Sequence, residues 1–258
     1  KDINPAGGAW IGGTFWDELA LLNKGKAVFV AYDPNHGREL WVTDGTASGT
    51  RLVKDITPGV GDTSSGGPMN MISTGKGKVL FLANDGVHGN ELWITDGSKD
   101  GTKLLADINE GSASSGPDEF FSLGNGKFLF IATDQDHGRE LWITNGTAKG
   151  TKLVKDINAG EGNAFSSVVS YGLVEKGKAV FQANDGMSGI ELWITDGTTK
   201  GTKLLKDIKP GEESSNPFSF TDMKAAKAAA ASFATEHDQA DGHRLYDAHL
   251  AGHDDFFF

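Results

Sequence analysis

The sequence predicts an all-β fold: a five-bladed β-propeller with four-stranded blades of about 50 residues each. Three observations predict it. A signature recurs at a nearly fixed spacing, short alternating segments are separated by turn residues, and the two chain ends match in phase. We expect residues 1–258 to form a single domain, because a closed all-β fold can use this whole length as one unit.

The repeat is read from two recurring triplets. Glu-Leu-Trp begins at positions 39, 91, 140 and 191, and a triplet ending in Asp-Ile begins at 1, 54, 106, 155 and 206. One more period after position 206 reaches the end of the sequence, so position 1 follows position 258 in phase. The expected units are approximately 4–56, 57–108, 109–157, 158–208, and 209–258 together with 1–3. Pairing of the N-terminal strand with the last blade would close the ring and cover two sheet edges.

Each unit carries four strand signals separated by turns rich in Gly, Asn and Asp. In the first unit the strand segments are WDELALL, KAVFVAYD, RELWVTD and TRLVKDI, and the turns are NKGK, DPNHG and DGTASG. A linear β-solenoid is the weaker alternative, since it gives no reason for the phase match. Residues 224–234 have helical propensity, but their place in the repeat predicts a strand.

Composition excludes several classes of protein. The net charge of −11 and the scattered lysines argue against nucleic-acid binding. There is no cysteine, hence no disulfide framework, and no apolar run is long enough to span a membrane. The sequence starts inside a repeat without a signal peptide, so we expect a mature or trimmed product.

The signature resembles the bacterial ELWxxDGT repeat family. The residues that carry the resemblance are Glu39-Leu40-Trp41 with Asp44-Gly45-Thr46, and the matching positions from Glu91 and from Glu191. The third copy departs by having Asn145 in place of the aspartate, and the fifth lacks the signature. The resemblance implies a propeller-like repeat in a bacterial secreted or surface protein and names no catalytic residue. We therefore expect an extracellular or cell-surface location.

The signature residues are interpreted as structural. Strand alternation places the tryptophans on a face that packs between blades, and the aspartates are expected to accept backbone N–H bonds in the following turn. A ligand role for the same residues is the alternative. The structural set is Trp41, Trp93, Trp142, Trp193, Asp44, Asp96 and Asp196.

A second repeated element is the candidate ligand-binding site. The second and third strands of each unit are joined by a turn with an aspartate three residues before a histidine, or before a serine in unit four: Asp33 and His36, Asp85 and His88, Asp134 and His137, Asp185 and Ser188. Strand order predicts that these turns share one end with the serine-rich connections between units, at Ser64-Ser65, Ser114-Ser115, Ser166-Ser167 and Ser214-Ser215. We call this end the loop rim. Either the aspartate and histidine only stabilise their own turn, or they bind polar ligands such as sugars, with rings from Trp10, Trp16, Phe165 and Phe218.

Metal and enzyme signatures are missing. No calcium-loop pattern is present, so no cofactor is expected, although the carboxylates leave calcium open. There is no G-x-S-x-G, H-E-x-x-H or P-loop motif, and near-identical blades make a unique catalytic constellation hard to build.

The resulting functional hypothesis is a non-catalytic, multivalent propeller that binds carbohydrate in a lectin-like way. The alternative is a structural or protein-interaction module of a larger extracellular assembly, with a glycosidase-like enzyme favoured least. The expected partner is therefore a carbohydrate or another protein.

Overall fold

The computed structural model describes residues 3, 19–58, 67–166 and 169–220 of the 258-residue chain. These residues form four antiparallel sheets of four strands, each in simple sequence order. The predicted all-β class and four-stranded units are confirmed. The expected fifth unit lies almost entirely outside the described residues, as do Trp10, Trp16 and the predicted strand at 224–234.

Every sheet is formed by one repeat unit. The first contains β1 (Leu19–Leu21), β2 (Ala27–Asp33), β3 (Gly37–Thr43) and β4 (Arg51–Lys54). The second contains β5 (Met69–Ser73), β6 (Val79–Asn84), β7 (Asn90–Thr95) and β8 (Lys103–Ala106). The third contains β9 (Asp118–Ser122), β10 (Phe128–Asp134), β11 (Gly138–Thr144) and β12 (Lys152–Lys155), with a short 3-10 turn, η1, at Ala148–Gly150. The fourth contains β13 (Tyr171–Glu175), β14 (Lys178–Asn184), β15 (Ile190–Thr195) and β16 (Lys203–Lys206).

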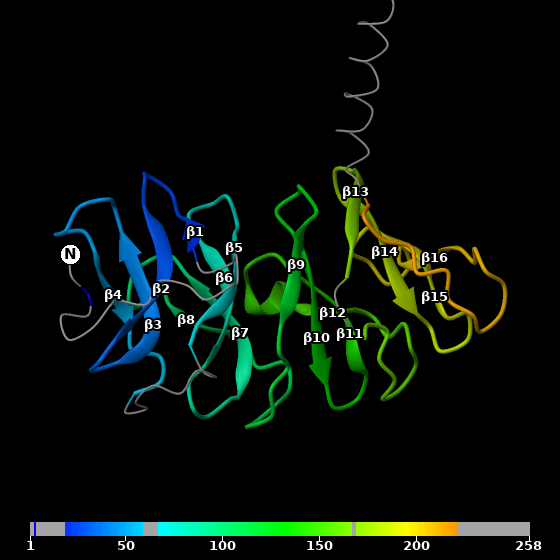
Figure 1. Ribbon diagram of the computed structural model, residues 1–258, viewed down its shortest axis with the longest axis horizontal. Coiled ribbons are helices and arrows are strands. Elements are labelled where there is room, and N and C mark those ends of the chain that lie inside the picture. Colours follow the sequence, from blue (N-terminus) through cyan, green and yellow to red (C-terminus); the bar gives the residue numbers. More distant parts are fainter. Residues whose placement is uncertain (1–2, 4–18, 59–66, 167–168, 221–258) are drawn as a thin grey trace, which may run out of the picture.

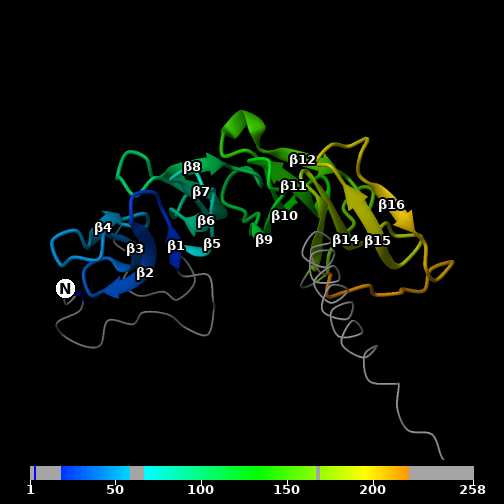
Figure 2. The same cartoon turned by 90° about the horizontal axis from the view of Figure 1, so that it is seen from above.

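The sheets stand side by side like the blades of a propeller (Figure 1). Seen from above they follow an arc, with the first strand of each sheet on the concave side and the last strand on the convex side (Figure 2). β1 contacts β5, and β5 contacts β9. The fold is therefore propeller-like, with four blades in the described part of the chain.

Blades pack by the same residues at each interface. One face of a sheet presents aliphatic side chains, and a phenylalanine, an alanine and a tryptophan of the next sheet pack against them. Between the first and second sheets, Val30, Leu40 and Val42 share a buried cluster with Phe81 and Trp93. Equivalent clusters join the second sheet to the third and the third to the fourth. Strand alternation explains this arrangement, because neighbouring residues of β3 point to opposite faces of the sheet.

Within residues 3, 19–58, 67–166 and 169–220, no helix is both long and apolar enough to cross a bilayer.

Candidate functional site

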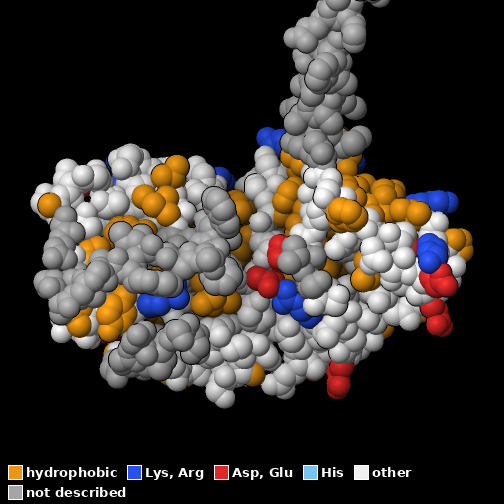
Figure 3. All heavy atoms as spheres, in the orientation of Figure 1, with side chains coloured by type: hydrophobic (Ala, Val, Ile, Leu, Met, Phe, Trp, Pro, Cys, Tyr) orange, Lys and Arg blue, Asp and Glu red, His pale blue; other side chains and the backbone are white. Residues whose placement is uncertain are grey.

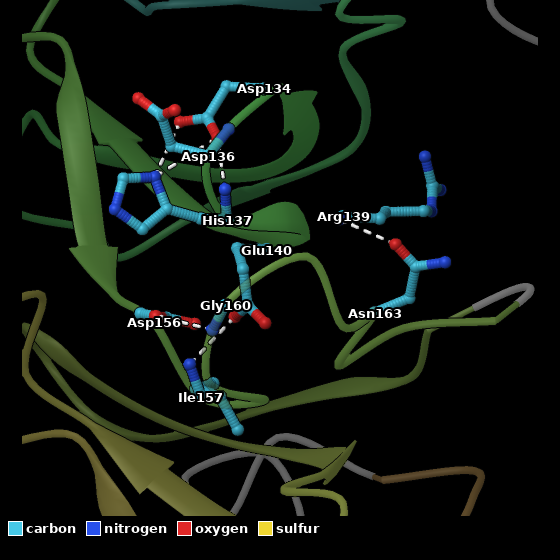
Figure 4. Close-up of polar contacts among 9 residues, drawn as sticks. All are labelled: Asp134, Asp136, His137, Arg139, Glu140, Asp156, Ile157, Gly160 and Asn163. Atoms are coloured by element: carbon cyan, nitrogen blue, oxygen red, sulfur yellow. Dashed lines mark hydrogen bonds and ion pairs between the residues drawn. The ribbon is translucent and has the colours of Figure 1, made fainter.

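The structure brings the predicted turns and connections together at the loop rim. The Asn90 amide donates to Ser114 Oγ at 2.9 Å, and the Ile190 amide donates to Ser214 Oγ at 2.8 Å. In the third unit Arg139 N donates to Asn163 Oδ1 at 2.8 Å (Figure 4). In the second, third and fourth units the turn is thus tied to the connection that follows its own sheet.

Every predicted aspartate–histidine pair lies within a single turn. Nδ1 of His36 is 2.8 Å from Asp33 Oδ2, and the corresponding distance is 2.7 Å for His88 and Asp85. In the third unit, His137 Nδ1 lies 2.9 Å from Asp134 Oδ2 (Figure 4). In the fourth unit the shorter Ser188 side chain donates to Asp185 at 3.3 Å.

The same aspartates also hold the backbone of their turns. Asp134 Oδ1 accepts from the amide of Asp136 at 3.0 Å and from that of His137 at 2.7 Å. Asp85 and Asp185 accept the two equivalent amides in their units. Each of these carboxylates is therefore an internal hydrogen-bond acceptor, which matches the turn-stabilising alternative.

The pairing changes proton affinities in the expected directions. The hydrogen bond from Asp134 raises the pKa of His137, and Asp85 does the same to the pKa of His88. Burial opposes ionisation of Asp85, but the hydrogen bonds from His88 outweigh it and lower the pKa of that carboxyl.

The four signature glutamates form a second repeated element, which the sequence interpretation missed. Each glutamate is buried in the third strand of its sheet, near the end that meets the loop rim, and faces an alanine across the strand pair, as Glu39 faces Ala31. Each accepts the amide of the isoleucine that follows its last strand. The distances are 2.9 Å for Ile56 to Glu39, 2.8 Å for Ile108 to Glu91, 3.0 Å for Ile157 to Glu140, and 2.8 Å for Ile208 to Glu191.

In the second and fourth units, the glutamate also binds a serine at the far end of the connection that leads out of its sheet. Glu91 accepts from Ser115 N at 2.8 Å and from Ser115 Oγ at 2.6 Å. Glu191 accepts from the same two groups of Ser215 at 2.9 and 2.7 Å. One carboxylate thus fixes both ends of a loop that leads to the next blade. A signal for this role was present: a glutamate recurring among apolar strand residues must be buried with hydrogen-bond partners.

Burial perturbs the ionisation of these glutamates. Loss of solvent raises the pKa of Glu39 to about 7, although the amides of Thr57 and Ile56 act in the opposite direction. Burial likewise raises the pKa of Glu140 to about 7. In the fourth unit the hydrogen bonds from Ser215 and Ile208 outweigh burial, and the pKa of Glu191 is lowered.

Three of the four tryptophans, Trp93, Trp142 and Trp193, lie at interfaces between described blades. Lys54 Nζ lies 5.4 Å from the ring centre of Trp93, and Lys155 Nζ lies 5.6 Å from that of Trp193. Trp41 packs on the first sheet in a cluster with Phe29, Ala31 and Ile3.

The signature aspartates form turns at the opposite end of the sheets. Asp44 Oδ1 accepts from Thr46 N at 3.0 Å and from Thr46 Oγ1 at 2.7 Å, and Asp96 and Asp196 repeat this pattern. Asn145 makes the same two contacts with Thr147, so the turn needs an oxygen acceptor but no charge. Glycine is required beside it, because a Cβ on Gly101 would lie 2.0 Å from Asp96 Oδ1.

Within the described residues, no group of three or more His, Asp or Glu side chains is placed to hold a metal ion. Calcium binding stays a prediction. Of the proposed aromatic platform, Phe165 is buried beside Phe181, and Phe218 is exposed.

Comparisons with known proteins give likeness of fold. No family model and no curated protein matches the sequence, so membership of the ELWxxDGT family stays a prediction. A puromycin hydrolase structure is 17% identical with a TM-score of 0.46, over 76% of this chain and 29% of that one. TolB from Acinetobacter baumannii is 12% identical with a TM-score of 0.43, over 78% and 45%. Prolyl oligopeptidase B from Galerina marginata is 16% identical with a TM-score of 0.40, over 70% and 25%.

These likenesses describe the fold and carry no statement about activity. The chain spans less than half the length of each of the three proteins, at 29%, 45% and 25%.

The prediction of a multivalent, lectin-like carbohydrate-binding protein is wrong. The physical reason lies in the turns, where Asp33, Asp85 and Asp134 are bonded to the histidine and the amides of their own turn. A sugar hydroxyl would have to compete with these internal bonds.

Replacing Glu91 by leucine tests the role of the buried carboxylate. The change leaves the amides of Ile108 and Ser115 without their acceptor in a buried place. We expect a loss of about 2–4 kcal/mol in the free energy of unfolding, measured by urea denaturation. Glu110→Leu, at an exposed position, is the control and should change stability little. Equal effects of the two substitutions would contradict this role.

The raised pKa of Glu39 predicts a pH-dependent difference between the wild type and Glu39→Gln. Since the folded-state pKa of about 7 exceeds the usual 4.5, the stabilising contribution of the protonated acid is present below pH 4.5 and is lost as pH rises through 7. Glutamine stays neutral and can keep the acceptor for Ile56 and Thr57. From pH 5 to pH 8 the variant should gain on the order of 2 kcal/mol relative to wild type in urea unfolding. A constant difference across this range would refute the shift.

Proposed function

We propose that this chain is a non-catalytic, five-unit propeller-type scaffold that binds another polypeptide at its loop rim. We place this scaffold outside the cell or on its surface, as part of a larger protein or assembly. The proposal has two separable parts, the five-unit ring and the binding of a polypeptide.

The observation that supports polypeptide binding is the chemistry of the exposed positions on the rim. The rim carboxylates are hydrogen-bonded within their own turns, whereas three apolar side chains face solvent. Val87 is 64% exposed, Met187 73% and Phe218 76%. Val87 and Met187 occupy the same place in their turns, one residue before His88 and Ser188.

Two of these exposed apolar side chains, Met187 and Phe218, belong to the rim end of the fourth sheet. The amides of Ser215 and Asn216 donate to Ile190 O, so the connection that carries Phe218 runs beside the turn that carries Met187. A hollow lined by Phe165, Ile190 and Phe218 lies beside this connection. Exposed methionine and aromatic side chains over a rigid backbone suit contact with apolar residues of a protein partner.

Selection from a random peptide library tests the rim. We expect the selected peptides to converge on apolar residues, and their affinity to fall at least tenfold, by about 1.4 kcal/mol or more, for Met187→Ser with Phe218→Ser. Lys200→Ser, in an exposed turn at the other end, is the matched control and should bind like wild type. Mass spectrometry should recover the bound peptide intact. Equal binding by the rim variant would overturn the rim site, and cleavage of the peptide would overturn a non-catalytic role.

A further inference from the structure

The fourth sheet has a face that its counterparts bury. Val53, Leu105 and Val154 are 4%, 7% and 2% exposed, whereas Leu205 at the same repeat position is 47% exposed. The isoleucine after the last strand shows the same contrast. Ile56, Ile108 and Ile157 are 4%, 9% and 5% exposed, and Ile208 is 51% exposed. Among the residues that the structure describes, no further sheet covers this face.

The residues of this face match the side of a blade interface that receives the next sheet. Lys54 Nζ donates to Thr102 O of the next sheet at 3.0 Å, and Lys155 Nζ donates to Thr202 O at 3.1 Å. Each of these lysines also lies over the tryptophan of that next sheet. Lys206 occupies the equivalent place on the fourth sheet and is exposed. The face therefore has the groups that a further blade would contact.

The chain itself turns onto this face at Phe220. A side-chain carbon on Gly172 of β13 would lie 2.6 Å from Phe220 Cβ and 3.3 Å from Val180 Cγ2, so Phe220 lies against the inner part of the face. Ser219 N donates to Ser170 Oγ at 3.1 Å, next to β13. Hydrophobic side chains gather around β13 and β14 on the side shown in Figure 3.

Phe220 repeats a contact that earlier units make. Met71, in the first strand of the second sheet, joins the cluster of the first sheet, and Ser73 Oγ donates to Leu21 O at 2.8 Å. Phe120 packs in the same way against the cluster of the second sheet. By this comparison, Phe220 lies where the first strand of a fifth blade begins.

The contact that Ile3 makes with the first sheet fits the same fifth blade. Ile3 packs against Phe29, Ala31 and Trp41 of the first sheet. Ile56 belongs in the same way to the cluster that holds Phe81, Ala83 and Trp93 of the second sheet. Ile3 therefore takes the position of an isoleucine that follows the last strand of a preceding blade.

We propose that residues 221–258 dock on the face formed by Leu205, Lys206 and Ile208 as three strands of a fifth blade, which Ile3 and its neighbours complete. This segment is longer than the stretch from the start of β13 at 171 to the end of β15 at 195. Tyr246 stands at the signature tryptophan position and would lie beneath Lys206. The inference rests on the five-unit part of the proposed function and is independent of polypeptide binding at the rim.

Photo-crosslinking in the full chain tests the docking. Benzoylphenylalanine is placed at position 206, because the equivalent Lys54 and Lys155 stay only partly buried beside the next sheet, so the ring should be tolerated there. The products are mapped by peptide mass spectrometry. We expect crosslinks within one chain to residues 221–258. The same group at Lys200, in an exposed turn at the opposite end, should give at least tenfold fewer crosslinks to that segment.

Each other outcome overturns the proposal. Crosslinks between two copies would show that the face joins protein molecules, and crosslinks only to other parts of the same chain would assign it another contact. Absence of any crosslink from position 206 would show an uncovered face. Because the peptide selection measures the rim separately, failure of this docking leaves the rim result unaffected.

Discussion

The structure depends on a buried carboxylate in the third strand of each described blade. Glu39, Glu91, Glu140 and Glu191 lie among apolar strand residues, where an unpaired acid would be costly. Each is held by the amide of the isoleucine that begins the connection to the next blade. The same group thus satisfies buried polar atoms and fixes the path of the chain out of the sheet.

Blade packing follows from that fixed path. In the first three blades, the isoleucine bound by the glutamate enters the cluster between its own sheet and the next, as Ile157 does between the third and fourth sheets. The lysine just before it reaches the next sheet in two of the three interfaces, through Lys54 and Lys155. The carboxylate therefore connects local loop geometry to the spacing of the blades, and the repeat serves as a scaffold.

Much of the fold could be predicted from sequence because its signals are local and repeated. Strand alternation placed Trp93 and Trp193 at blade interfaces, and the Asn145 substitution pointed to an uncharged role for the signature turn. The glutamates were missed because alternation assigns a face without showing which amides lie opposite. That information depends on where the connection after β4 or β8 returns, and the sequence pattern does not contain it.

The turns of the candidate site were predicted in place, but the hydrogen bonds within them were not. Turn order correctly brought His88 and Ser114 to one end of the sheets. Spacing alone could not show that Asp85 would bond to its own histidine and amides, since this depends on the turn conformation. The exposed Val87 and Met187 were not predicted as binding residues, because a single apolar residue in a turn is common on protein surfaces.

Native-state hydrogen exchange of the isoleucine amides tests the central role of the glutamates most directly. The amides of Ile108 and Ile157 lie outside the strands, so only their bonds to Glu91 and Glu140 would protect them. The account predicts that they exchange as slowly as strand amides such as those of Leu92 and Leu141. Exchange at the rate of exposed loop amides such as that of Lys149 would contradict it.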